Sequence, residues 1–329
     1  SGTQEERERT VLHFEGLDTL AEIYLNGEKI GTTDNMFIPH DIPATRLREG
    51  CNDLIVHILP AVIAARELPA APGHFAQYYN YAGLQVRKAA HAYGWDIMPR
   101  AVTAGIWRDV SLRLHRPNRL EDTYLYTLSL PDAQGQARAA LFYRAVLSED
   151  DISRYQLTVE GRCGGHVFRA QETLWFSSGH LHITIPDALV WNVAGRGEPH
   201  LYEVTVTLLL DGREADTQRF RFGLRSIELV RSSVTDSSGS GAFYFLVNGE
   251  KIFIKGTNWV PVDAFHSRDK ERIPQILPLV RELGCNMIRC WGGSVYEDHE
   301  FFDFCDANGI LVWQDFAMGC AIYPRGEDM

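Results

Sequence analysis

The most regular hydrophobic pattern lies in the last quarter of the chain, from Phe253 to Tyr323. Three short apolar runs there are each typical of a buried strand: 253–260, 286–291 and 310–316. The segment 270–283 between the first two has apolar residues at helical spacing. The segment 296–308 also predicts a helix, and Asn308-Gly309 is a common left-handed helix stop. This order predicts the beginning of a parallel α/β barrel or of a doubly wound sheet.

Two prolines conflict with the first of these helices. Pro274 and Pro278 lie four residues apart inside it. A proline in a helix interior removes a hydrogen bond and costs about 3 kcal/mol. We therefore expect this helix to begin late or to kink near Pro278.

Each predicted strand ends in residues that a folded core does not require. The first runs into Asn258, Trp259 and Asp263, the second into Trp291, and the third into Asp315. In a βα barrel the carboxyl ends of the strands form the active-site face. Tryptophan beside polar groups at these ends suggests a site that stacks on a sugar and binds its hydroxyls. For each tryptophan the alternative, that it only fills the core, stays open.

Residues 10–116 alternate between apolar and polar positions, which is typical of a β-sandwich with one solvated face per sheet. The clearest strands are 11–14, 21–25, 54–59 and 110–114. Asn26-Gly27 predicts a tight hairpin, and the five-residue sequence that begins there recurs at Asn248-Gly249. We interpret the recurrence as shared hairpin chemistry. Residues 61–93 hold few such strands and predict a long excursion, a kind of loop that is often functional.

The excursion runs into a loop, 93–100, in which Trp95 precedes Asp96. Together they offer a stacking face and a hydrogen-bond acceptor. Taken alone, this pair favours the simpler interpretation that Trp95 fills the sandwich and Asp96 caps a turn.

A second β region follows at 118–225, and its pattern suits an immunoglobulin-like sandwich. Six alternating runs predict its strands: 124–130, 139–147, 155–160, 181–185, 202–210 and 218–222. The Ser/Gly-rich segment 232–241 then predicts a mobile turn before the parallel region.

Composition narrows the function more than the fold. The chain has 329 residues, a net charge of -11 and 45% hydrophobic residues. This charge argues against nucleic acid or an anionic membrane as the partner. No apolar run approaches the ~20 residues that span a bilayer. The six cysteines show no metal-ligand spacing, and we expect the four in the last region to be buried free thiols. No metal or other cofactor is predicted, and the compartment (cytoplasm, periplasm or lysosome) stays open.

A set of short motifs lies along all three regions of the chain: 14–19, 23–27, 33–37, Gly94-Trp-Asp96, Pro99-Arg100, Gly105-Ile-Trp-Arg108, Leu201-Tyr202, 222–225, Gly256-Thr-Asn-Trp-Val-Pro261, 284–289, Trp291-Gly-Gly293 and Trp313-Gln-Asp-Phe316. A sandwich, an immunoglobulin-like sandwich and a barrel, in that order, resemble glycoside hydrolase family 2, and these motifs resemble those of its β-mannosidases. They run from about Val11 to Pro324.

The resemblance implies three domains. A jelly-roll-like, sugar-binding β-sandwich would occupy 1–117, an immunoglobulin-like β-sandwich 118–225, and the first part of a TIM (β/α)8 barrel 226–329. A complete barrel takes about 250 residues. We therefore expect the chain to be an N-terminal fragment that also lacks the family's first strands.

The implied activity is exo-acting, retaining hydrolysis of a terminal β-mannoside, with one carboxyl as acid/base and a second as nucleophile about 5–5.5 Å away. In the family these glutamates follow the fourth barrel strand and lie near the seventh. We therefore expect both of them beyond Met329, and we expect the fragment alone to be inactive. The resemblance implies that Asp96 binds hydroxyls beside Trp95 and that Trp291 is a stacking wall. It also implies that Asn258 and Asp315 frame the floor of the site.

Two departures from the family pattern put the sugar in doubt. Ile97-Met98 stands where the family usually has Trp-Gly, and Ser294 stands where a third glycine usually follows Trp291. One alternative is another family 2 specificity, for β-galactosides, β-glucuronides or β-glucosaminides. Another is a non-catalytic carbohydrate-binding protein. The oligomeric state stays open.

Overall fold

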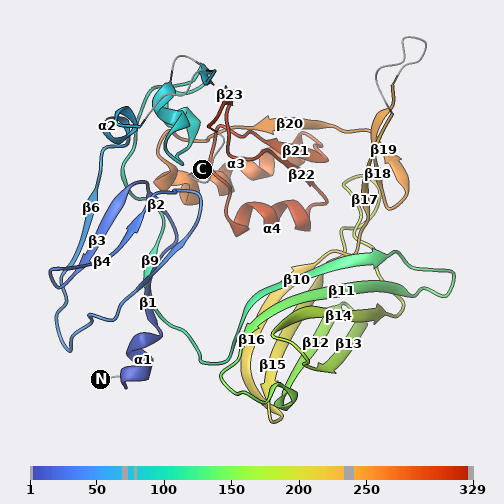
Figure 1. Ribbon diagram of the computed structural model, residues 1–329. Helices are drawn as coiled ribbons and strands as arrows, with labels where there is room; N and C mark the ends of the chain where they lie inside the picture. Colours follow the sequence, from blue (N-terminus) through green and yellow to red (C-terminus); the bar gives the residue numbers. More distant parts are fainter. Residues whose placement is uncertain (1–2, 69–72, 78–79, 233–240, 325–329) are drawn as a thin grey trace.

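A computed structural model describes residues 3–68, 73–77, 80–232 and 241–324. Along the chain these residues form a small β-sandwich, a larger β-sandwich, and a unit of parallel strands with helices (Figure 1). In Figure 1 the small sandwich lies on the left, the larger one at the bottom, and the parallel unit above.

Two of the expectations concern residues outside these ranges. Most of the turn predicted at 232–241 lies outside the described residues. So does Met329, beyond which the two catalytic glutamates are expected, and their place therefore stays a prediction.

The small sandwich has two three-stranded antiparallel sheets, β5-β1-β9 and β4-β3-β6, and a short pair, β2-β8. Its elements are α1 (Gln4–Glu8), β1 (Thr10–Phe14), β2 (Leu17–Asp18), β3 (Ala21–Leu25), β4 (Glu28–Thr33), β5 (His40–Pro43), β6 (Leu54–Ile58), β8 (Gly105–Ile106) and β9 (Val110–Leu114). Phe14, Leu17, Ile23 and Leu25 form the centre of its core. The four strands expected from alternation are confirmed.

Both Asn-Gly hairpins adopt the same conformation. Asn26 and Gly27 have φ angles of 53° and 85°, and Asn248 and Gly249 have 53° and 80°. Two consecutive positive φ angles make the turn whose twist matches that of the flanking strands. The interpretation of the repeat as shared hairpin chemistry is confirmed.

The predicted excursion between β6 and β8 is also confirmed. It contains α2 (Ala61–Arg66), β7 (Phe75–Ala76), η2 (Tyr81–Leu84) and η3 (Ala90–Tyr93). β7 pairs with β23 (Ala321–Ile322) near the other end of the chain. The excursion therefore carries the loop at Trp95 towards the parallel unit.

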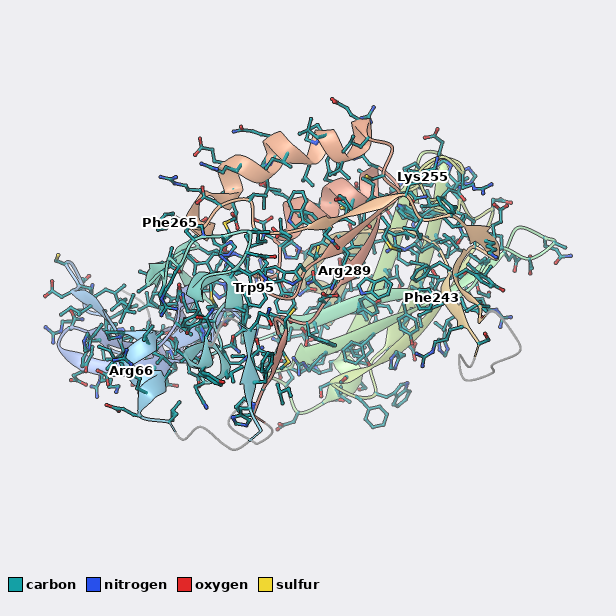
Figure 2. All side chains as sticks on the ribbon, turned by 90° about the horizontal axis from the view of Figure 1, so that it is seen from above. Arg66, Trp95, Phe243, Lys255, Phe265 and Arg289 are labelled. Carbon is teal, nitrogen blue, oxygen red and sulfur yellow. The ribbon has the colours of Figure 1, made fainter. Side chains whose placement is uncertain are left out.

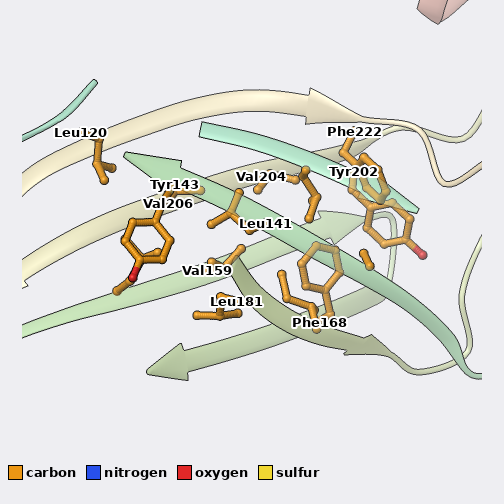
Figure 3. Close-up of a cluster of buried hydrophobic side chains, with 14 of the residues drawn as sticks. Leu120, Leu141, Tyr143, Val159, Phe168, Leu181, Tyr202, Val204, Val206 and Phe222 are labelled. Atoms are coloured by element: carbon orange, nitrogen blue, oxygen red, sulfur yellow. The ribbon is translucent and has the colours of Figure 1, made fainter. Parts of the chain in front are cut away.

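The larger sandwich packs the sheet β10-β11-β14 on the sheet β13-β12-β15-β16. Its elements are β10 (Arg119–Ser129), β11 (Ala137–Val146), η4 (Ile152–Arg154), β12 (Tyr155–Cys163), β13 (His166–Thr173), β14 (Ser178–Ile185), β15 (Tyr202–Leu210) and β16 (Arg213–Phe222). Figure 3 shows its core, with Leu141 and Phe168 among the buried side chains. The six predicted strands are present. The seventh, β13, was missed because Phe168 is its only buried residue, so the strand shows little alternation.

The last part of the chain begins with an antiparallel sheet and continues as alternating parallel strands and helices. Its elements are β17 (Ile227–Arg231), β18 (Phe243–Val247), β19 (Glu250–Ile252), β20 (Gly256–Trp259), η5 (His266–Arg268), α3 (Asp269–Glu282), β21 (Met287–Cys290), α4 (His299–Ala307) and β22 (Leu311–Gln314). β20, β21 and β22 are parallel neighbours in that order, as predicted. Within the described ranges these three strands form an open sheet and close no barrel.

Two boundaries of this unit differ from the prediction. The first strand begins at Gly256 because the side chain of Asn286 binds the backbone of Phe253 and Lys255 in place of a strand partner. The second helix begins at His299, after Asp298 in an extended conformation. Gly309 has a φ of 67° and ends this helix, as expected.

Helix α3 contradicts the late start expected from its prolines. It begins at Asp269 and runs through Pro274 and Pro278, both of which lie on its exposed face. The opposite face buries Ile273, Leu277 and Val280 in the core against the sheet. Carbonyl groups that lose a partner on the exposed side can bind water, and apolar burial supplies the stabilisation.

A mixed core joins the larger sandwich to the parallel unit. Trp191, which is fully buried, packs with side chains of the β18–β19 hairpin and with Met287 and Leu311 of the parallel strands. Its Nε1 donates a 2.7 Å hydrogen bond to the carbonyl oxygen of Asp306. The hairpin thereby covers the amino-terminal end of the parallel sheet.

All six cysteines are free thiols. Cys285, Cys290 and Cys305 are buried, as expected, but Cys320 is exposed because it lies in the loop that follows β22. Among the described residues, no helix has the length and apolar character needed to cross a membrane.

Candidate functional site

The carboxyl end of the parallel sheet presents one row of side chains from three strands. Asn258 of β20 pairs with Arg289 of β21, and Arg289 pairs with Trp313 of β22. Residues that pair in register point to the same face of a sheet. That face is opposite to the one that packs on the helices, to which Trp259 and Ile288 belong.

Arg289 connects two of the predicted site residues. Its Nη2 lies 2.7 Å from Oδ2 of Asp315, and its Nε lies 3.3 Å from Oδ1 of the same carboxylate. Its Nη1 donates to Oδ1 of Asn258 at 3.2 Å. A two-pronged guanidinium–carboxylate contact fixes both partners in orientation. Sequence reasoning missed Arg289, although a charged residue inside a short apolar strand is unusual enough to have indicated it.

Asp315 also joins the loop that follows β21. The backbone N–H of Gly292 donates to its Oδ2 at 3.3 Å, and its own N–H donates to the carbonyl oxygen of Cys290 at 3.1 Å. The Trp291 loop and the Asp315 loop therefore meet at one point above the sheet.

Trp95 reaches this point from the small sandwich. Its ring centroid lies 5.1 Å from that of Trp291, with 58° between the two planes. The N–H of Trp95 donates to the carbonyl oxygen of Met98 at 3.0 Å, which closes the loop that carries it. Figure 2 shows Trp95 and Arg289 in the middle of the molecule. The interpretation of Trp95 as a plug of the sandwich is wrong, because its ring packs on a residue of the parallel unit.

Asp96 lies at the exposed tip of the same loop. Within the described part of the chain its carboxylate accepts no hydrogen bond, so the predicted turn cap is not formed. Nor do the described residues show a hydrogen bond between Asp96 and Asn258, Trp291 or Asp315. The neighbouring Ile97 is 46% exposed.

For Trp259, the alternative that the tryptophan fills the core is confirmed. This residue is buried, and its ring lies 5.1 Å from that of Phe301 in helix α4. Its Nε1 donates to Oε1 of Glu297 at 2.9 Å. Burial raises the pKa of Glu297 to about 7, although the hydrogen bond from Trp259 lowers it. The carboxyl is therefore partly protonated near neutral pH.

These groups suit a polyhydroxylated ligand. Carboxylate and amide oxygens accept hydrogen bonds from hydroxyl groups, and indole rings bury the apolar face of a sugar. Across the described residues, no group of three or more His, Cys, Asp or Glu side chains is arranged to hold a metal ion.

Comparison with known protein families identifies both sandwiches. Residues 1–108 match the galactose-binding-like domain of glycosyl hydrolase family 2, and residues 118–225 match the domain described as glycosyl hydrolases family 2. The chain belongs to glycoside hydrolase family 2.

Individual relatives agree with this assignment. The chain is 36% identical over 326 residues to beta-mannosidase B of Thermothelomyces thermophilus, covering 96% of this chain and 37% of that protein. It is 31% identical to the beta-mannosidase of Capra hircus, covering 96% of this chain and 38% of the relative. It thus spans about two fifths of the length of the curated relatives that it matches.

Solved structures extend the likeness to the fold. The crystal structure of the beta-D-mannosidase from Dictyoglomus thermophilum has a TM-score of 0.85 and 35% identity, covering all of this chain and 41% of that one. A beta-glucuronidase from Bifidobacterium dentium has a TM-score of 0.67 at 21% identity and shows the fold alone.

Proposed function

We propose that the chain supplies the sugar-recognition side of a retaining, exo-acting glycoside hydrolase that removes terminal β-mannose residues. The observation that carries this proposal is the contact of Trp95, from the small sandwich, with Trp291 above the parallel strands. The Asn258–Arg289–Asp315 network lies at the same end of the sheet, and Asp315 accepts a hydrogen bond from the N–H of Gly292, next to Trp291. The beta-mannosidase names of the relatives support mannose as the sugar.

Each predicted site residue has a role in this proposal. Trp291 is the wall on which the apolar face of the sugar stacks, and Trp95 lies beside it. Asp96 accepts hydrogen bonds from two hydroxyl groups, for which its exposed carboxylate is available. Asn258 and Asp315 frame the floor of the site, and Arg289 holds both in orientation.

We further propose the division 1–117, 118–225 and 226–329, with the last part as the beginning of a (β/α)8 barrel. Three parallel strands with two helices on one face support this proposal, since each βα step repeats the barrel unit. In the family the two catalytic glutamates belong to later strands. We assign neither role to a residue of this chain and propose that both follow Met329 in the longer protein. The ligand is a β-linked mannoside or an oligosaccharide that ends in one.

A panel of chromogenic glycosides tests the function. The 329-residue chain and a polypeptide extended to the length of the relatives are assayed on β-mannoside, β-galactoside, β-glucuronide and β-glucosaminide. We expect turnover of the β-mannoside by the extended protein and none by the chain alone. Turnover by the chain alone would mean that Asp96 or Asp315 performs the chemistry, and would overturn this assignment.

The panel also tests the alternative specificity. Ile97 and Met98 replace the aromatic and small residues that usually accompany Asp96, which changes the rim of the site. Preference of the extended protein for another glycoside would favour a different family 2 activity. Sugar binding without turnover of any glycoside would favour a carbohydrate-binding protein.

A further inference from the structure

A chain of three buried polar side chains crosses the boundary between the small sandwich and the parallel unit. Nε2 of His91, in η3, lies 2.6 Å from Nε2 of His266, in η5. Nδ1 of His266 lies 2.6 Å from Oδ2 of Asp269, at the start of α3. The three residues are 1%, 8% and 9% exposed.

The partners determine where the protons lie. A carboxylate only accepts, so Nδ1 of His266 carries a proton and donates it to Asp269. In this arrangement Nε2–H of His91 donates to Nε2 of His266. Nδ1 of His91 has no hydrogen-bond partner within the described chain, which suits a nitrogen without a proton. Burial, aided by His266 and Lys88, lowers the pKa of His91 to about 3 and keeps its ring neutral.

The backbone of His91 is bonded to both tryptophan loops. Its N–H donates to the carbonyl oxygen of Gly293 at 3.0 Å, two residues after Trp291. Its carbonyl oxygen accepts from the N–H of Gly94 at 2.9 Å, one residue before Trp95. One residue thus connects the loop of Trp95 with the loop of Trp291.

Space around these loops is tight, so their relative position is narrowly set. A Cβ atom at Gly293 would lie 2.0 Å from the ring of Trp291. A Cβ atom at Gly319 would lie 3.0 Å from Cβ of Ala90 and 3.7 Å from the ring of Trp95. Small displacements of His91 are therefore passed on to both indoles.

We propose that His91 is a positioning residue that holds Trp95 against Trp291 through its side-chain bond to His266 and its backbone bond to Gly293. The inference rests on the proposed function, in which these indoles form the sugar-stacking wall. The hydrogen bond to His266 fixes the His91 ring, the ring fixes the backbone, and the backbone fixes the two loops.

The closeness of the two indoles supplies a readout that global stability does not. Strong ultraviolet transitions of two tryptophans in contact couple and give a pair of circular-dichroism bands of opposite sign. Trp95→Phe and Trp291→Phe should each abolish this couplet, which assigns it to the pair. We expect His91→Ala to lose most of the couplet, and His91→Gln, whose amide can still donate to His266, to retain it.

A second variant changes the other partner of the hydrogen bond between His91 and His266. His266→Phe keeps a ring of similar size but removes the acceptor, and it should also lose the couplet. If His91→Ala fails to fold, His266→Phe alone tests the positioning role of His91. His182→Ala, at an exposed position of β14, is the matched control and should leave the couplet unchanged.

A couplet that persists in both His91→Ala and His266→Phe would overturn the proposal, as would its absence from the unaltered chain. The couplet requires no ligand, so this result is independent of the glycoside panel. A failed panel with the expected couplets would reject the mannosidase function and leave the positioning role intact.

Discussion

Replacing Glu297 with glutamine should change how the stability of the chain depends on pH. The pKa of this carboxyl is raised from 4.5 to about 7, mainly by burial, with smaller contributions from Asp269 and Asp298. The folded chain therefore binds more protons than the unfolded chain between these two values. The stability that the protonated Glu297 carboxyl contributes is fully present below the unfolded pKa. It is lost as the pH rises through about 7.

The size of the effect follows from the shift. A displacement from 4.5 to about 7 corresponds to roughly 3 kcal/mol. The side chain is only partly buried, so solvent screening reduces our expectation to about 2 kcal/mol. Glutamine keeps an acceptor for Nε1 of Trp259 but cannot ionise. Glu297→Gln should thus match the unaltered chain in acid and exceed its stability by that amount above neutral pH.

Urea unfolding measured from about pH 5 to about pH 8.5 tests this expectation, with unfolding free energies compared at each pH. Glu282→Gln, on the exposed end of α3, is the control and should shift stability by less than about 0.5 kcal/mol at every pH. If the difference between Glu297→Gln and the unaltered chain stayed constant over this range, the carboxyl would not be ionising at a cost, and the reasoning would be refuted.

Four further substitutions test other parts of the fold by urea unfolding. Gly309→Ala should cost about 3 kcal/mol, because its φ is 67° and the new Cβ would lie 2.7 Å from a backbone nitrogen of the larger sandwich. Gly284→Ala, with a φ of 68° and open space around it, should cost only about 1 kcal/mol, and equal losses would contradict the close approach. Lys88→Met should cost about 3–5 kcal/mol, because it leaves the buried Asp18 carboxylate without its cation, and a neutral result would mean that water reaches the pair. Burial lowers the pKa of His91 from 6.5 to about 3. The stability that the neutral ring contributes is therefore present above pH 6.5 and is lost as the pH falls towards 3. This loss amounts to at most about 5 kcal/mol. His91→Gln should remove that part of the acid loss, and an unchanged acid profile would count against a buried neutral ring.

Local patterns predicted most elements because they depend on nearest neighbours along the chain. Alternation marked β3 and β15, and Asn-Gly marked two hairpins, since the turn itself requires positive φ angles. The edge strand β13 was missed because only one of its residues enters the core. The late start expected for α3 was wrong because the cost of its prolines is local, whereas burial of Ile273, Leu277 and Val280 depends on the sheet beneath them.

The residues of the candidate site also divide into those that the sequence indicated and those that only the structure revealed. Motifs in the sequence marked Asn258, Trp291 and Asp315, which the parallel strands bring to one end of the sheet. They did not distinguish Trp259, a core residue, from Trp291, because both follow apolar strands and only the direction of the side chain separates them. Arg289 escaped notice because its function depends on two partners from neighbouring strands.

The sequence by itself determined the order of the sandwiches and the parallel unit, the hairpins, and the family to which the chain belongs. Only the tertiary structure decided that Trp95 faces Trp291 and that His91 is bonded to His266. Hydrophobic periodicity records which face of each element is buried, and therefore fixes elements one at a time. Contacts between residues far apart in the sequence depend on how those faces pack together, and no local pattern encodes that packing.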